Sequence, residues 1–183
     1  MGHSTIDWIA DYIEHLEERP VTPDVRPGDV RASLPERAPE APEPFTDLLD
    51  DVNSLIAPAI THWQHPGFFG YFSCNSSAPA ILGELLSAGF GINGMLWSTS
   101  PAATELETHM LDWLLDLCGL PDCFRSDGKG GGVIQDSASS ATLCAILAAR
   151  DRSGGAPELP KLVAYTSTQA HSSIEKDIKI AGL

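Results

Sequence analysis

The sequence predicts an α/β domain in which helices alternate with short parallel strands, preceded by an extended, helical N-terminal arm. Two observations predict this class. Apolar residues recur at helical spacing in several segments of the 183-residue chain. Two apolar stretches, 132–134 and 161–167, are typical of short strands, the second of a buried one. Helices alternating with strands favour a layered domain with a parallel sheet. Because such a sheet needs more than two strands, we expect the chain to form the front part of a larger fold.

The N-terminal arm is expected to begin with an amphipathic helix over residues 4–19. Ser4 is its expected N-cap, and Pro20 closes it. Residues 20–44 then hold seven of the fourteen prolines, which predicts an extended strap with little regular structure. Since the apolar stripe of the first helix needs burial, we expect the arm, residues 1–77, to pack on a partner subunit.

Three further helices are expected in the middle of the chain, starting at Thr46, Pro79 and Pro101. Ser100 is the expected cap of the last one, and Gly119 the residue after its end. Residues 62–77 form an irregular segment with five aromatic side chains between Trp63 and Phe72. They are either part of the core or a loop that forms a site, and the Gly and Pro content favours a loop. The pair Glu105 and Glu107 is interpreted as helix-surface charge.

The segment "GGGVIQDSASSATL", residues 130–143, is a Gly-rich turn before a helix that is expected from Ala138 to Arg150. It does not match a dinucleotide fingerprint, because Val133 stands where a third glycine is required. It does not match a P-loop either, because Lys129 is followed by glycine.

The residues Ser137, Ala138 and Ser139 at the start of this helix allow two interpretations. Either serine could simply cap the helix. Alternatively, the free N–H groups of the first turn and the two hydroxyls could bind a phosphate. Asp136 would repel such an anion. The residues of the turn leave both interpretations open, and helix caps are the commoner of the two.

Composition excludes several other classes of function. A net charge of −14 opposes nucleic-acid binding, and no apolar run is long enough to span a bilayer. The four cysteines form no CxxC pair, so we expect no zinc site, and His62 and His65 are interpreted as packing or hydrogen-bonding residues. The N-terminus lacks the pattern of a signal peptide, so we expect a cytoplasmic protein with reduced thiols, of which Cys118 and Cys144 should be buried.

Four segments together resemble the group II pyridoxal-phosphate decarboxylases, and within that family the aromatic-L-amino-acid decarboxylase type. In chain order they are "THWQHPGFFGYFSCNSS", "SPAATELETHMLDWL", "GGGVIQDSASSATLCAILAARD" and "LVAYTSTQAHSSIEKDIKIAG". The resemblance implies the N-terminal part of a type I, aspartate-aminotransferase-like fold with pyridoxal 5′-phosphate as cofactor. It implies that residues 78–183 are the first, incomplete part of the large cofactor-binding domain. It also implies a homodimer of complete units.

The resemblance assigns roles to individual residues. The cofactor phosphate would be bound by Ser137, Ala138 and Ser139, and the ring would stack on His171, the catalytic histidine. The substrate pocket would be lined by five residues of one segment: Trp63, Tyr71, Phe72, Ser73 and Cys74. Two further residues, Asn93 and Met95, would reach into it from the other subunit. The chain departs from the family at Asp136, where glycine is usual. It departs from the animal enzymes at Ser73 and Cys74, which replace Pro-Thr, and at Asn93 and Met95, where larger apolar groups are found.

The resemblance also implies what this chain lacks. The family's Schiff-base lysine stands in an "HK" context, and none of the four lysines here does. We therefore expect the chain to be inactive alone and to need a complementary C-terminal chain or segment that carries that lysine. The complete enzyme would release CO2 from an aromatic L-amino acid and leave an amine.

Three alternatives remain open beside this reading. One is an aldehyde-forming enzyme of the same family, and another is a non-catalytic interaction fragment. The third is a serine hydrolase using Ser137 and His171, which the missing G-x-S-x-G elbow disfavours.

Overall fold

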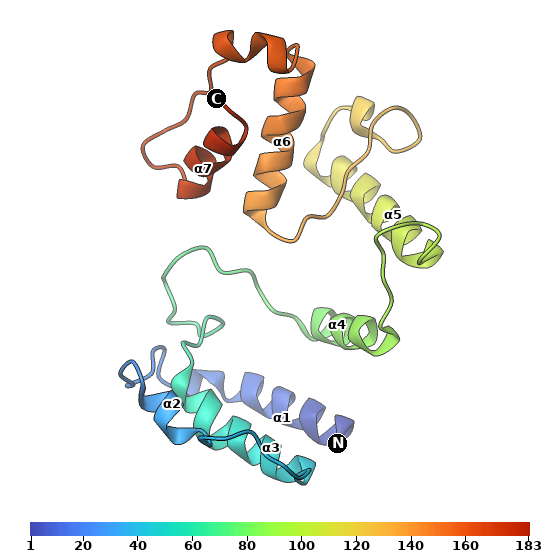
Figure 1. Ribbon diagram of the computed structural model, residues 1–183. Coiled ribbons are helices and arrows are strands. Elements are labelled where there is room, and N and C mark those ends of the chain that lie inside the picture. The colour runs from blue at the N-terminus through green and yellow to red at the C-terminus, as the bar shows by residue number, and fades with distance from the viewer. The chain divides into compact units, whose positions relative to one another are not determined.

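The computed structural model describes all 183 residues and contains seven α-helices and no β-strand (Figure 1). The chain divides into two compact units, Met1–Gly89 and Phe90–Leu183. The helices are α1 (Gly2–Glu14), α2 (Asp29–Ser33), α3 (Phe45–Asp51), α4 (Ala78–Phe90), α5 (Pro101–Cys118), α6 (Ala138–Arg152) and α7 (Ser172–Ile180). Short 3-10 turns lie at Leu16–Glu18, Ala57–Ala59, Asp122–Phe124 and Ala156–Lys161.

The first unit begins with the amphipathic helix that the sequence predicts, and it extends to Gly89, past the expected end of the arm at residue 77. Helix α1 begins two residues before Ser4, after Met1, and no side chain caps it, so the expected Ser4 cap is wrong. Over residues 20–44 the only helix is the five-residue α2, as the prolines predict. Helix α3 continues into a wider π-type turn at Val52–Ile56.

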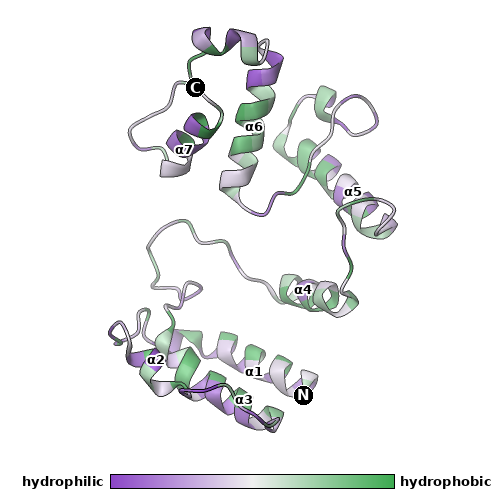
Figure 2. Cartoon of the chain, viewed as in Figure 1, coloured by the Kyte–Doolittle hydropathy of each residue, from purple (hydrophilic) through white to green (hydrophobic).

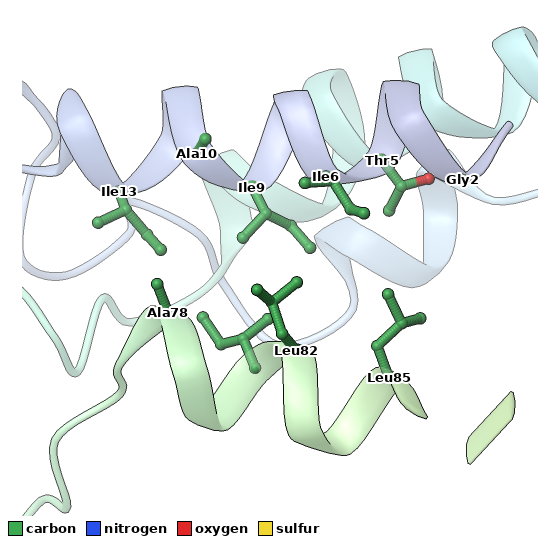
Figure 3. A pocket seen from close by; sticks show the side chains of 10 residues that line it. Gly2, Thr5, Ile6, Ile9, Ala10, Ile13, Ala78, Leu82 and Leu85 are labelled. Atoms are coloured by element: carbon green, nitrogen blue, oxygen red, sulfur yellow. The ribbon is translucent and has the colours of Figure 1, made fainter. Parts of the chain in front are cut away.

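An apolar groove of about 280 Å³ lies between α1 and α4. Figure 3 shows the labelled isoleucines of α1 pointing toward the labelled leucines of α4. The groove leaves Ile6 and Ile13 exposed, so α4 covers the apolar stripe of α1 only in part. The face that the sequence expects to be buried is therefore still accessible in this unit.

The second unit confirms the expected helices at 101 and 138. Helix α5 ends where Gly119 adopts a left-handed conformation at φ 62°, a geometry that favours glycine. Ser100 occupies the N-cap position of α5, but its hydroxyl makes no capping hydrogen bond, which corrects the expected cap. Helix α7 follows the segment that ends in His171 and packs against α6.

The two predicted strands, 132–134 and 161–167, are not formed. Lys161 ends a 3-10 turn, and the residues after it are extended without a ladder partner. Val163 and Tyr165 expose 70% and 93% of their surface. An extended segment becomes a strand only when a neighbouring strand takes its N–H and C=O groups, and no other segment of this chain does so. The prediction of a partly formed parallel sheet is therefore wrong for this chain, which is helical.

Both units leave much apolar surface uncovered. The chain exposes 14,622 Å², whereas even two separate compact units of half its mass would together expose about 10,000 Å². Figure 2 shows hydrophobic residues along α4, α5 and α6. All four cysteines are exposed, which corrects the expected burial of Cys118 and Cys144. None of the helices combines the length and the apolar character that a membrane-spanning segment requires.

Candidate functional site

Ser137 is the N-cap residue of α6, as one of the two interpretations predicts. Its Oγ accepts the N–H of Ser140 at 3.2 Å and lies 2.9 Å from the Ser140 hydroxyl. The N–H groups of Ala138 and Ser139 have no acceptor within the chain. The cap and an anion seat are therefore compatible, because the cap uses one donor and leaves two at the positive end of a 15-residue helix. The neighbouring Asp136 is exposed and makes no hydrogen bond.

The Gly-rich approach to this turn lies directly against other backbone and against α5. A Cβ added at Gly130 would lie 2.4 Å from the carbonyl oxygen of Cys123. One added at Gly132 would lie 3.3 Å from Leu111 of α5. Gly131 adopts φ 149°, a backbone conformation that favours glycine. A separate steric reason thus favours glycine at each of these three positions.

A carboxylate of α5 holds the same segment. Glu107 Oε1 accepts the backbone N–H of Ile134 at 2.7 Å. Glu107 lies on the helix surface, as the sequence predicts, but sequence reasoning missed its contact with Ile134 because 27 residues separate the two partners. Glu105 also has a partner, since its Oε1 accepts the indole N–H of Trp97 at 2.7 Å.

Two more carboxylates of α5 hold the turn before the glycines. Asp112 accepts the N–H of Ser126 at 3.1 Å and also the Ser126 hydroxyl. These hydrogen bonds lower the pKa of Asp112, because they favour its ionised form. Asp116 pairs with Arg125 of the same turn. Helix α5 therefore holds the chain at Arg125 and Ser126 and again at Gly132 and Ile134.

His171 is the N-cap residue of α7, and its Nδ1 accepts the N–H of Ser173 at 3.2 Å. The C-terminal ends of α6 and α7 meet, because Arg150 Nη1 donates to the carbonyl oxygen of Ala181 at 2.7 Å. The two helices run side by side in the same direction, so Ser137 and His171 lie at the same end of the pair (Figure 1). Two candidate residues that are 34 positions apart in the sequence thus belong to one end of one helical layer.

The aromatic segment of the first unit is an ordered loop. Trp63 stacks on Tyr71 with ring centroids 5.3 Å apart and an interplanar angle of 11°. Tyr71 is the only non-glycine residue with positive φ, at 54°. Phe72 is fully exposed, and Ser73 and Cys74 are exposed as well. The loop therefore presents these side chains outward, as a site-forming loop does.

Sequence reasoning missed the residue that closes this loop. The side-chain amide of Gln64 donates to the carbonyl oxygen of Cys74 at 2.7 Å and accepts the N–H of Ser76 at 2.9 Å. One side chain thereby ties the two arms of the loop together. Residue type could not reveal this, because the contact depends on a fold over ten to twelve positions.

His62 attaches the start of the loop to α1. It is 2% exposed, and its Nδ1 lies 2.7 Å from the Tyr12 hydroxyl. Burial, with Arg19 and His65 as further causes, lowers the pKa of His62. His65 Nδ1 accepts the N–H of Gly67 at 2.8 Å. Both histidines are therefore packing and hydrogen-bonding residues, as the sequence predicts.

Asn93 and Met95 lie in the connection before α5, in the second unit. Asn93 Oδ1 accepts the N–H of Met95 at 2.8 Å, and its carbonyl oxygen accepts the Thr99 hydroxyl at 2.8 Å. The connection is thus held by its own polar groups, and Met95 is exposed. The candidate residues fall into both units: the aromatic loop in the first, and Asn93, Met95, the Ser137 turn and His171 in the second.

Comparison with known proteins gives a consistent result. The pyridoxal-dependent decarboxylase conserved domain matches residues 27–183. The chain is 52% identical to phenylacetaldehyde synthase of Arabidopsis thaliana and 48% identical to aromatic-L-amino-acid decarboxylase of Rattus norvegicus; all of this chain is covered, with 38% and 41% of those proteins.

A solved structure extends this result to the fold. The crystal structure of Catharanthus roseus tryptophan decarboxylase in complex with L-tryptophan matches with a TM-score of 0.90 and 43% identity. The match covers 99% of this chain and 39% of that one. The chain therefore spans about two fifths of the length of the relatives it matches.

Proposed function

This chain belongs to the pyridoxal-dependent decarboxylase family, and we propose that it forms the N-terminal part of an enzyme that removes CO2 from an aromatic L-amino acid. The family consists of carboxy-lyases with pyridoxal phosphate as cofactor. The observation that carries the proposal is the match of nearly the whole chain, at a TM-score of 0.90, to a tryptophan decarboxylase structure.

The cofactor phosphate is assigned to the turn of Ser137, Ala138 and Ser139. The structure fits an anion at this place, because two backbone N–H groups there lack an acceptor and the serine side chains supply hydroxyls. His171 is assigned to the ring face. Its position at the same end of the α6–α7 pair supports this role. Bound pyridoxal phosphate supplies the electron sink for the electron pair left when CO2 departs.

The substrate side chain is assigned to the loop of residues 62–77. Relatives that match the whole chain are named for phenylacetaldehyde, tyrosine, tryptophan and aromatic amino acids. An exposed aromatic loop offers such a ring stacking partners, of which Phe72 is fully exposed. Ser73 and Cys74 replace the Pro-Thr pair of the animal enzymes, so this part of the pocket differs from theirs.

None of the four lysines of this chain stands in the "HK" context of the family's Schiff-base lysine. Two of its four lysines are paired with acidic neighbours on the surface, Lys161 with Glu158 and Lys179 with Glu175. We assign the lysine that holds the cofactor to a complementary C-terminal segment, and the uncovered α1 face to a partner subunit in a homodimer. The 4,000 Å² or so of excess exposed surface supports both assignments.

Formation of an aldehyde is a second candidate. It is favoured by the 52% identity to phenylacetaldehyde synthase. That reaction would consume O2 and water with the amino acid and give aldehyde, CO2, ammonia and hydrogen peroxide. Simple decarboxylation needs no oxidant, so oxygen uptake distinguishes the two.

The test is a pair of chimeras in which this chain replaces the matching N-terminal part of the rat decarboxylase or of the Arabidopsis synthase. We expect the first to release CO2 and amine from tyrosine, tryptophan or phenylalanine in preference to leucine or glutamate. His171→Ala should lower the rate by about 100-fold, whereas Ser153→Ala, beyond the far end of α6, should not change it. A folded, cofactor-binding chimera that prefers glutamate would contradict the proposal. If both chimeras consume O2 and release aldehyde, the second candidate replaces the first.

A further inference from the structure

Glu107 is a charged residue to which the proposed function gives no role, yet it is only partly exposed and its carboxylate accepts the N–H of Ile134 at 2.7 Å. Ile134 stands three residues before Ser137. We propose that Glu107 is the positioning residue of the phosphate-binding turn, because it fixes the point from which the chain enters α6. This inference rests on the proposed function of that turn.

The geometry leaves the segment little freedom around this hydrogen bond. On one side of Ile134, Gly132 packs so closely on Leu111 that a Cβ there would lie 3.3 Å from Cδ1. On the other side, three residues span at most about 10 Å. The start of α6 therefore lies within about 10 Å of the hydrogen-bonded Ile134 amide.

The chemistry of the acceptor matters as well as its place. A carboxylate makes a charge-assisted hydrogen bond to an amide, which is roughly twice as strong as a neutral one. Loss of the acceptor would release the Ile134 N–H to water, because this hydrogen bond is exposed, and the segment would lose its tether to α5. Glutamine keeps an acceptor oxygen on a side chain of the same length but loses the charge, so Glu107→Gln should retain much of the function that Glu107→Ala loses.

The chain supplies a matched control on the same helix. Glu105 Oε1 also accepts an N–H at 2.7 Å, but its donor is the indole of Trp97 and not the Gly-rich segment. Glu105→Ala removes the same charge from α5 without touching the approach to α6. A general effect of helix charge would therefore appear in both alanine variants.

The experiment uses the full chain and two probes, pyridoxine 5′-phosphate and pyridoxine. Neither carries an aldehyde, so neither condenses with lysines, and the ratio of their affinities reports the phosphate seat alone. Hydrogen exchange is measured in parallel at the amides of residues 134–140. In Glu107→Ala we expect faster exchange at these amides, affinity for the phosphate probe lowered by about tenfold and unchanged affinity for pyridoxine. Glu107→Gln should recover most of the loss, and Glu105→Ala should match the wild type.

The outcomes separate this inference from the function on which it rests. Glu107→Ala with wild-type exchange overturns the inference, whatever happens to the affinities, because the effect would then not pass through the Ile134 amide. Faster exchange at Ile134 alone, with residues 137–140 unchanged, also overturns it. If the wild type binds both probes equally while Glu107→Ala still speeds exchange at 137–140, the phosphate seat is refuted and the positioning role stands.

Discussion

The segments that lead into α6 and α7 were both predicted as strands, and neither is one, but they differ in how they are held. The segment before α6 packs on α5 through Gly132, and the N–H of Ile134 donates a hydrogen bond to Glu107 of the same helix. The segment before α7 has no such anchor, and Val163 and Tyr165 project from it with 70% and 93% of their surface exposed. A segment fixed by side chains keeps its path without a sheet, whereas one that relies on backbone pairing needs its neighbouring strand.

The difference bears on the two ligand-binding ends of the proposed site. Ser137 stands on a fixed approach, so the phosphate seat can be formed within this chain. His171 stands after an exposed stretch and is held mainly by its own cap on α7. If a further segment pairs with the stretch before α7, we expect the position of His171 to change more than the position of Ser137.

Within the segment before α6, the largest expected effect comes from filling its closest contact. Gly130→Ala would put a Cβ 2.4 Å from the Cys123 carbonyl oxygen and 2.5 Å from Phe124 backbone, which cannot move aside as a side chain can. We expect a loss of about 1–3 kcal/mol in the free energy of unfolding by urea. Gly128→Ala is the control, because only one backbone atom lies within 4 Å, at 3.9 Å. Equal effects at both positions would mean that the segment does not pack on its turn.

Removal of the cap at the end of the fixed segment should have the next largest effect. Ser137→Ala deletes the Oγ that accepts the Ser140 N–H, and such caps contribute about 1 kcal/mol. Ser153→Ala is the matched comparison at the other end of α6, because it also deletes one side-chain hydrogen bond, from Oγ to the Ala149 carbonyl oxygen. Urea unfolding followed by circular dichroism measures the difference. No loss in Ser137→Ala would show that the anchors on α5, and not the cap, start the helix.

Sequence reasoning could predict what depends on local patterns. Apolar spacing located α5 and α6, and Gly119 marked a helix end, because these features are encoded within a few residues. It could not predict that residues 132–134 and 161–167 form no strand, because a strand needs a neighbouring strand and no short sequence pattern shows whether one is present. It also missed Glu107 and Gln64, whose partners lie 27 and 10 to 12 residues away. The assignment of the Ser137 turn to phosphate came from resemblance to a family, because a capped helix start is locally the same pattern.

Acid should loosen the turn at Ser126 from helix α5. The ionised carboxylate of Asp112 accepts hydrogen bonds from Ser126, and these hydrogen bonds lower the pKa of Asp112. The folded pKa thus lies below the unfolded value, so the contribution is complete above about pH 4 and is lost as pH falls through the folded pKa. Exchange at the Ser126 amide, corrected for intrinsic rates, should rise several-fold over that range. Asp112→Asn should abolish the pH dependence, and a wild type that shows none would remove Asp112 from the set of anchors.

The smallest effect is expected in the unanchored segment. Tyr165→Ser changes a side chain that touches little in this chain, so the free energy of unfolding should stay within about 0.5 kcal/mol of the wild type. Leu115→Ala, at a buried position of α5, should cost about 2–5 kcal/mol and shows that the assay detects a core change. In a chimera that supplies the remaining fold, the same Tyr165→Ser change should become costly, because a neighbouring strand would cover that side chain. A large effect in the chain alone would mean that the segment before α7 is already anchored, and the contrast with the segment before α6 would disappear.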